Sequence, residues 1–232
     1  MHVKGIVLAA GEGRRLGGEI PKAFTLIAGR PLVLRTLDRV FAASIIEQVI
    51  LVVAAADMER CEAMLRTDAA LRTRRWILHS GGKTRQESAK RGLEKAGADT
   101  DIILIHDAAR PFASVELIRR CVDAAITRGA AVPGLPAHDT IKMVSEDHWV
   151  QTTLKRDALW EIQTPQVFRR DLIVAAHEQA AREGLELTDD ALAVERYGKP
   201  VFVVEGERTN LKITVPEDVR LAELLIREGR VP

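Results

Sequence analysis

A glycine-rich, basic segment from Leu8 to Lys22 carries the side chains best suited to chemistry in this chain. It follows a short apolar stretch that is typical of a buried strand, and glycine lets the backbone approach a ligand closely. Arg14, Arg15 and Lys22 add fixed positive charge to the same turn. A strand, a glycine-rich turn and several cations together predict a site for a polyphosphate.

Two familiar glycine motifs do not fit the chain. The dinucleotide fingerprint needs a third glycine where Leu16 stands, and the nearest acidic residue for a ribose, Asp38, falls inside a predicted helix. A Walker loop would end at Gly82-Lys83-Thr84, but Ile77 occupies the position of its first glycine. A purely structural turn would explain the glycines of the first segment, although not its three cations.

Two further polar turns follow predicted strands. Gly81–Ser88 joins a strand to a helix, and His106–Pro111 ends the most apolar strand. In open α/β sheets ligands sit beyond the carboxyl ends of the strands, so the three turns are expected to meet at one crevice. Asp107 with Arg110 is either an ion pair that closes the strand or a pair facing the ligand. Lys212, between Leu211 and Ile213, fits either solvent or the same crevice.

Strand and helix patterns alternate along the first half of the chain. This alternation predicts an α/β fold with a mostly parallel, doubly wound sheet and right-handed crossovers. Ser114 is expected to cap one helix and Gly97 to end another. The predicted strands are Val3–Leu8, Gln48–Val53, Trp76–His79 and Ile102–His106, and the predicted helices are Pro31–Ala43, Met58–Arg66, Thr84–Ala96 and Ser114 to about Arg128.

The pattern changes after Val132, where prolines and a glycine interrupt it. Two extended pieces, Thr140–Val144 and Trp149–Leu154, flank a polar turn and predict a projecting β-hairpin. An isolated hairpin is marginal in water, so this one is expected to pack on a second subunit. Beyond it we expect helices at Asp171–Glu183 and Asp189–Tyr197, a strand at Val201–Val204, and a last helix opened by a capping box of Thr214 with Glu217.

Composition restricts the class of protein. Among 232 residues, 34 basic and 33 acidic side chains give a net charge of +1, which argues against non-specific nucleic-acid binding. No apolar run approaches a membrane span, and no signal peptide is expected. Two cysteines favour a reducing compartment, so a soluble cytoplasmic protein is predicted.

The six histidines lack metal-ligand spacing, and no motif for a protein nucleophile occurs. Any Mg²⁺ is therefore expected to rest mainly on substrate phosphates.

Seven segments, taken in order, resemble those of the 2-C-methyl-D-erythritol 4-phosphate cytidylyltransferases. They are LAAGEGRRLGGEIPK, GGKTRQES, HDAARP, DTIK, LWEIQTPQVF, TDDA and NLKITVPED, and the resemblance covers almost the whole chain. It implies a Rossmann-like nucleotidyltransferase fold in a single domain, 1–232, with a dimerisation arm at about 135–156 that makes a homodimer. The implied reaction joins CTP and methylerythritol phosphate with release of pyrophosphate and uses Mg²⁺. A ribitol 5-phosphate cytidylyltransferase and a non-catalytic nucleotide-binding homologue are the alternatives.

The resemblance also assigns roles to residues of this chain. Arg15, Lys22 and Lys212 are the implied catalytic cations at the phosphates. The implied CTP contacts come from Ala10, Gly11, Gly13, Gly82, Ser88 and Asp107, where Asp107 holds sugar or polyol hydroxyls. The implied substrate pocket contains Arg110, Thr164 and Thr188, with Thr140 and Arg156 reaching it from the partner's arm. The chain departs from the family pattern at Ala23, His138 and Lys155, none of which removes an implied charged role.

Overall fold

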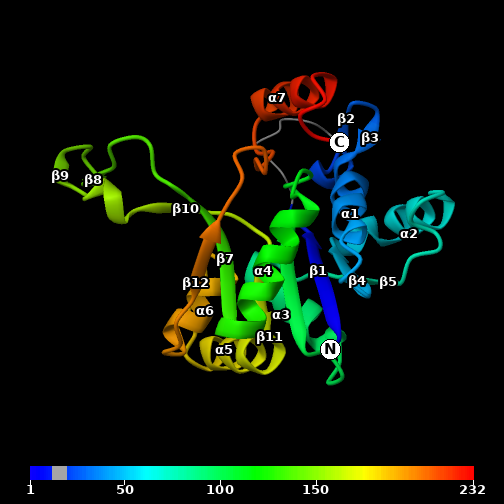
Figure 1. Cartoon of the computed structure of the whole chain (residues 1–232), viewed down its shortest axis with the longest axis horizontal. Coiled ribbons are helices and arrows are strands. Elements are labelled where there is room, and N and C mark those ends of the chain that lie inside the picture. Colours follow the sequence, from blue (N-terminus) through cyan, green and yellow to red (C-terminus); the bar gives the residue numbers. More distant parts are fainter. Residues whose placement is uncertain (12–19) are drawn as a thin grey trace.

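An eight-stranded sheet runs through the centre of the computed structural model, which describes residues 1–11 and 20–232 (Figure 1). Its spatial order is β5 (Trp76–Ser80), β4 (Gln48–Val53), β1 (Val3–Ala9), β6 (Ile102–Asp107), β11 (Gln166–Arg169), β7 (Ala130–Pro136) and β10 (Trp160–Ile162), with β12 (Phe202–Glu205) also paired to β7. Strands β5, β4, β1 and β6 are mutually parallel. β11 is antiparallel to both of its neighbours.

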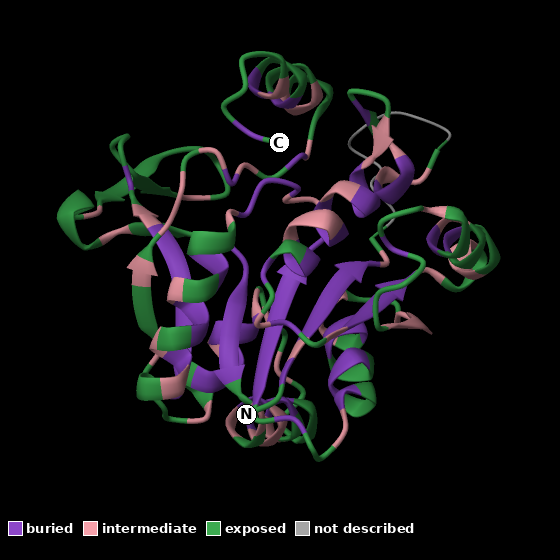
Figure 2. Ribbon diagram, turned by 45° about the vertical axis from the view of Figure 1, so that its right-hand side comes forward, coloured by how far each residue is buried: buried purple, intermediate pink, exposed green. Residues whose placement is uncertain are grey.

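Helices cover both faces of this sheet, and its central strands β4, β1, β6 and β11 are mostly buried (Figure 2). One face packs against α1 (Leu32–Ala42), α2 (Met58–Thr67) and α4 (Val115–Arg128), and the other against α3 (Arg85–Ala96), α5 (Arg170–Arg182) and α6 (Asp190–Arg196). The alternation of side chains along a strand divides β1 between the two cores. Val3 and Val7 enter the first, and Ile6 and Leu8 the second. The predicted mostly parallel, doubly wound sheet is confirmed.

Most of the predicted helix ends are confirmed, but the capping box predicted at the start of the last helix is wrong. The Ser114 hydroxyl accepts a hydrogen bond from the Leu117 N–H at 2.9 Å, and Gly97 ends α3 with φ +79°. At α7 (Pro216–Arg227), Asp218 rather than Glu217 closes the cap, because its Oδ2 accepts from the backbone N–H of Thr214 at 2.6 Å and of Val215 at 2.9 Å. The Thr214 hydroxyl instead donates to the Lys212 carbonyl at 3.1 Å.

After residue 132 the chain contributes more to the sheet than was predicted. β7 continues through Pro133 and Pro136, and both β10 and β11 pair along the same edge of it. Pro133 is tolerated there because it lies opposite the gap between β10 and β11, where its carbonyl accepts from the Gln163 N–H at 2.8 Å. The Thr164–Pro165 peptide bond in this gap is cis.

The predicted projecting hairpin is confirmed. Strands β8 (Lys142–Val144) and β9 (Val150–Thr153) form an antiparallel pair that extends away from the sheet (Figure 1). Its apolar side chains Met143, Val144, Trp149 and Val150 are all exposed. Within the described ranges, no helix has the length and apolar character needed to cross a membrane.

Candidate active site

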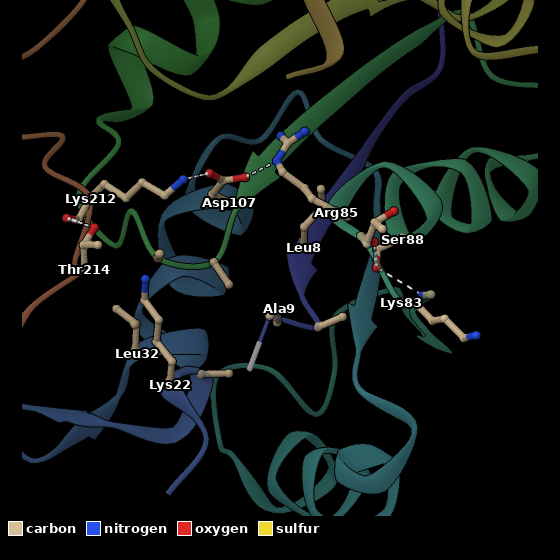
Figure 3. Close-up of a pocket in the computed structure, with 17 residues that line it drawn as sticks. Leu8, Ala9, Lys22, Leu32, Lys83, Arg85, Ser88, Asp107, Lys212 and Thr214 are labelled. Carbon is tan, nitrogen blue, oxygen red and sulfur yellow. Dashed lines mark hydrogen bonds and ion pairs between the residues drawn. The ribbon is translucent and has the colours of Figure 1, made fainter. Parts of the chain in front are cut away.

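A cavity of about 610 Å³ opens at the carboxyl ends of β1 and β6 (Figure 3). Four cationic residues line it, and among the described residues around it Asp107 supplies the one carboxylate. This surplus of positive charge suits a polyphosphate. Of the residues singled out in the sequence, the cavity collects Ala10, Gly11, Lys22, Gly82, Ser88, Asp107 and Lys212.

Close contact between two turns forms one wall of this cavity. A Cβ added at Gly81 would lie 2.5 Å from the Cβ of Ala10 and 2.7 Å from the Ser88 Oγ, so only glycine lets these turns meet. The Ser88 Oγ accepts from the Gly82 N–H at 3.1 Å and donates to the Thr84 carbonyl at 2.9 Å. The second predicted turn is therefore held rigidly against the end of β1.

Lys22 enters the cavity from a different element. It begins a short 3-10 helix, Lys22–Phe24, whose Ala23 and Phe24 are buried and anchor it beside α1. Its side chain points toward the part of the cavity occupied by Lys212 and Asp107 (Figure 3). Two other residues of the same predicted loop, Gly13 and Arg15, lie outside the described residues.

A second cavity of about 240 Å³ adjoins the first. It gathers Arg110, Thr164 and Thr188, three residues assigned by resemblance to the polyol pocket. Arg85, Asp107 and Lys212 line both cavities. A ligand in one cavity and a ligand in the other would therefore meet at these three side chains.

The two carboxylate oxygens of Asp107 each face a different cation. Its Oδ1 lies 3.1 Å from Arg85 Nε, and its Oδ2 lies 2.7 Å from Lys212 Nζ. Burial alone would raise the pKa of Asp107, but the positive charges of Arg85 and Lys212 hold that pKa well below its usual range. Asp107 is thus a fixed anion between otherwise cationic groups, able to accept hydrogen bonds from ligand hydroxyls.

A chain of hydrogen bonds behind Asp107 fixes the border of the second cavity. His106 Nε2 donates to the Arg110 carbonyl at 3.0 Å, which leaves Nδ1 to accept from the Thr164 hydroxyl at 2.8 Å. The Thr164 Oγ1 in turn accepts from the Asp107 N–H at 3.1 Å. The neutral imidazole satisfies every partner, and its complete burial lowers the pKa of His106 to about 4.

This buried histidine makes stability depend on pH. The unfolded chain takes up a proton near pH 6.5, while folded His106 stays neutral down to about pH 4. The contribution of His106 to the free energy of unfolding is therefore fully present above pH 6.5. It is expected to fall by about 2 to 3 kcal/mol between pH 7 and pH 4.5. Urea unfolding of wild type and His106→Gln at both pH values measures it. The variant should lose less stability over that interval; parallel losses would contradict the assignment.

Thr140 and Arg156 stand apart from both cavities. Neither occurs among the described residues that line them, and both are exposed residues of the arm. Arg156 Nη1 donates to the His138 carbonyl at 2.9 Å, and the His138 ring contacts Arg208. Within one chain the structure therefore does not bring these two predicted residues to the others.

Sequence reasoning missed two charged residues of the site. Arg85 lies in the GGKTRQES segment and Asp190 in TDDA, but neither was singled out. Arg85 Nη1 lies 2.8 Å from Asp190 Oδ2, so one guanidinium joins Asp107 and Asp190. The available signal was a charged residue inside each of two motifs already placed at the crevice.

The chain matches the family model described as 2-C-methyl-D-erythritol 4-phosphate cytidylyltransferase over residues 3–228. A protein of that description from Geobacillus kaustophilus is 42% identical over 227 residues, covering 97% of each chain. One from Syntrophus aciditrophicus is 40% identical and covers 99% of this chain and 98% of its own.

Solved structures show the same similarity. The crystal structure of 2-C-methyl-D-erythritol 4-phosphate cytidylyltransferase from Thermus thermophilus superposes with a TM-score of 0.79 at 37% identity, covering 98% of this chain and 100% of that one. The 4-diphosphocytidyl-2C-methyl-D-erythritol synthase from Anaerococcus prevotii gives a TM-score of 0.86 at 30% identity, covering 97% and 96%.

Proposed function

The chain belongs to the 2-C-methyl-D-erythritol 4-phosphate cytidylyltransferase family, and from this premise we propose that it transfers the cytidylyl group of CTP to 2-C-methyl-D-erythritol 4-phosphate. The products are 4-diphosphocytidyl-2-C-methyl-D-erythritol and pyrophosphate. The observation that carries this proposal is the pair of adjoining cavities that share Arg85, Asp107 and Lys212. We place CTP in the larger cavity and the polyol phosphate in the smaller one.

The reaction is a direct displacement at phosphorus. An oxygen of the polyol phosphate forms a bond to the α-phosphorus of CTP, and the bond from that phosphorus to the bridging oxygen breaks. Pyrophosphate leaves with the electron pair of the broken bond. Both reactants are anions, so the protein's task is to align them and to stabilise the charge of the transition state. No protein nucleophile is required.

We propose that cationic side chains supply this stabilisation. Lys22 and Arg15 are proposed to hold the triphosphate, together with backbone N–H groups of Ala10, Gly11 and Gly13. Lys212 is proposed to contact the reacting phosphates, since its Nζ stands 2.7 Å from the fixed carboxylate of Asp107. Gly82 and Ser88 would receive the cytidine, because their turn forms the rigid wall of the larger cavity.

The donor set around the larger cavity fits a Mg²⁺ ion that is held mainly by the triphosphate. Asp107 is the one carboxylate among the described lining residues, and both of its oxygens already face cations at 2.7 and 3.1 Å. Mg²⁺ commonly binds through substrate phosphates, waters and one or two carboxylates. When bound, the ion would withdraw negative charge from the phosphates. We propose that it arrives with CTP.

We propose further that a second copy of the chain completes the smaller cavity. The arm carries exposed Met143, Val144, Trp149 and Val150, and apolar surface of this kind favours a protein contact. Thr140 and Arg156 belong to this arm and are absent from the described linings of the cavities of their own chain. In a homodimer each arm would bring Thr140 and Arg156 to the polyol phosphate held by its partner.

Co-expression of two inactive variants tests this arrangement. Lys22→Ala removes a residue of the body, and Arg156→Ala one of the arm. Random pairing makes half of the dimers mixed, and each mixed dimer regains one intact site of two, so about a quarter of wild-type activity is expected. Mixed dimers isolated by two affinity tags should then show about half of the wild-type activity. Activity no higher than that of either variant alone would show that Arg156 serves its own chain.

The two cysteines support a reducing compartment, and we propose the cytoplasm. Cys61 and Cys121 are free and fully buried. Burial raises the pKa of each thiol to about 12, so both stay protonated and unreactive near neutral pH.

A pyrophosphate-release assay tests the function. Purified protein is supplied with CTP and Mg²⁺ and with either 2-C-methyl-D-erythritol 4-phosphate or ribitol 5-phosphate. We expect release with the first polyol and a much lower kcat/KM with the second. Preference for ribitol 5-phosphate would reassign the substrate, and tight CTP binding without release from either would identify a non-catalytic nucleotide-binding protein.

A further inference from the structure

The second acidic residue of the TDDA segment has no role in the mechanism above. Asp190 begins α6 and is 1% exposed, and it lies outside the described linings of both cavities. Its backbone N–H donates to the Gln166 Oε1 at 3.0 Å, which fixes the start of the helix. A carboxylate so deeply buried needs charged or hydrogen-bonding partners.

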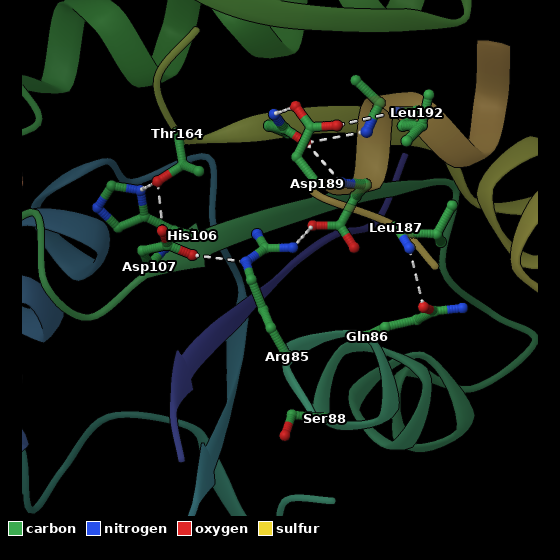
Figure 4. A network of polar contacts seen from close by, with 12 residues as sticks. Arg85, Gln86, Ser88, His106, Asp107, Thr164, Leu187, Asp189 and Leu192 are labelled. Atoms are coloured by element: carbon green, nitrogen blue, oxygen red, sulfur yellow. Dashed lines mark hydrogen bonds and ion pairs between the residues drawn. The ribbon is translucent and has the colours of Figure 1, made fainter. Parts of the chain in front are cut away.

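Those partners connect Asp190 to the active site. Its Oδ2 lies 2.8 Å from Arg85 Nη1, and its Oδ1 lies 3.1 Å from the Nε2 of His177, which is also buried. Arg85 reaches from the start of α3 toward Asp107 on its other side (Figure 4), with Nε 3.1 Å from the Asp107 Oδ1. Asp107 Oδ2 meets Lys212 at 2.7 Å. The charges thus alternate in one line from Lys212 through Asp107 and Arg85 to Asp190.

The geometry of Arg85 depends on both carboxylates. A guanidinium can bind one carboxylate through two nitrogens, which is its strongest arrangement. Here Nε faces Asp107 and Nη1 faces Asp190, while Nη2, the nitrogen that could join Nε on one carboxylate, has no hydrogen-bond partner among the described residues. The attraction between Nη1 and Asp190 thus sets the orientation of the guanidinium, and the second oxygen of Asp107 is left for Lys212. If Asp190 lost its charge, Arg85 would be free to turn, to bind both oxygens of Asp107 through Nε and Nη2, and to displace Lys212.

We propose that Asp190 is a positioning residue, which orients Arg85 so that Asp107 keeps one oxygen for Lys212 at the reacting phosphates. The inference rests on the proposed cytidylyl transfer, since Lys212 and Asp107 have their roles in that reaction. It also explains why α6, whose buried residues otherwise pack against the sheet, begins with two adjacent acids: Asp189 caps the helix and Asp190 reaches the site.

The test is a double-mutant cycle in kcat/KM with the full-length protein. Asp190→Asn keeps the size of the side chain and removes its charge, and it is expected to lower kcat/KM about tenfold or more. In an Asp107→Asn background the same substitution should change kcat/KM less than about twofold, because its effect passes through Asp107. Equal effects in the two backgrounds, or near-normal kinetics of Asp190→Asn, would overturn the proposal.

A matched control separates positioning from general stability. Arg30 also spans two carboxylates, Asp38 and Asp68, at 2.6 and 2.9 Å, but none of the three lies in the described lining of either cavity. Asp68→Asn is expected to lower the melting temperature and to leave kcat/KM near wild type. A loss of kcat/KM in this control as large as in Asp190→Asn would mean that loosened packing alone explains the effect.

A paired variant covers the case in which Asp190→Asn does not fold. Arg85→Met with Asp190→Leu leaves neither of these two charges buried alone, and exchanging a buried ion pair for apolar side chains is often neutral for stability. We expect it to fold and to lose about tenfold or more in kcat/KM, because Asp107 loses its orienting partner. Wild-type kinetics would overturn the proposal. An inactive wild-type protein would instead refute the proposed function itself.

Discussion

Lys22→Ala is expected to lower kcat by about two to three orders of magnitude while the chain stays folded. Lys22 points into the larger cavity, where the proposed triphosphate places most of the negative charge. Charge on the leaving pyrophosphate grows in the transition state, so a cation there stabilises the transition state more than bound CTP. We therefore expect a larger fall in kcat than rise in the KM for CTP, measured by steady-state pyrophosphate release.

Arg15→Ala should give a loss of similar size, because the same loop is proposed to hold the phosphates with both cations. Lys90→Ala is the matched control, since Lys90 is an exposed lysine of α3 outside the described lining of the cavities. It should turn over at the wild-type rate. Near-normal kcat in both Lys22→Ala and Arg15→Ala would remove the first loop from the mechanism.

Lys212→Ala is the second large effect that we expect, with kcat/KM lowered about a hundredfold for both substrates. Lys212 lines both cavities and lies 2.7 Å from Asp107, so its loss removes a cation from the place where the two anions meet. The fold should persist, because Arg85 still pairs with Asp107. Steady-state kinetics with each substrate varied in turn, and a thermal unfolding curve, measure both parts.

Lys212→Arg sharpens this prediction. A guanidinium is wider than an ammonium and binds carboxylates through two nitrogens, so it would compete with Arg85 for Asp107. Recovery should therefore be incomplete despite the retained charge. The exposed Lys199, which follows α6, gives a neutral control as Lys199→Ala. Full activity of Lys212→Arg would show that charge alone, without geometry, suffices at this position.

The sequence predicted the parallel half of the fold and the gathering of the three turns. Strands such as β6 are short, continuously apolar runs that end at a polar turn, and their pattern is set by neighbours close in the chain. The convergence of Gly82 and Asp107 followed from the rule that ligands bind at the carboxyl ends of parallel strands, whereas the pattern around Lys212 fitted either solvent or the crevice and the family resemblance assigned it to the site. These expectations needed only local pattern and general topology.

The remaining features depend on contacts between distant segments. β7 tolerates its prolines because Pro133 faces the gap between β10 and β11, which no local pattern discloses. Asp190 and Arg85 meet only after α6 folds against the far face of the sheet. At α7 the N-cap is Val215 rather than Thr214, so that Asp218 and not Glu217 stands three residues later and accepts the backbone hydrogen bonds. The roles of Arg15 and Gly13 stay predictions, because both lie outside the described residues.

Stereochemistry at the α-phosphorus tests direct transfer most closely. One diastereomer of CTP with sulfur on the α-phosphorus is reacted with 2-C-methyl-D-erythritol 4-phosphate, and the configuration of the phosphorothioate product is determined. A single in-line attack, aligned by Lys22 and Lys212 across the two cavities, predicts inversion at phosphorus. Retention would reveal two successive displacements through a covalent nucleotidyl-enzyme, and would contradict the proposed mechanism.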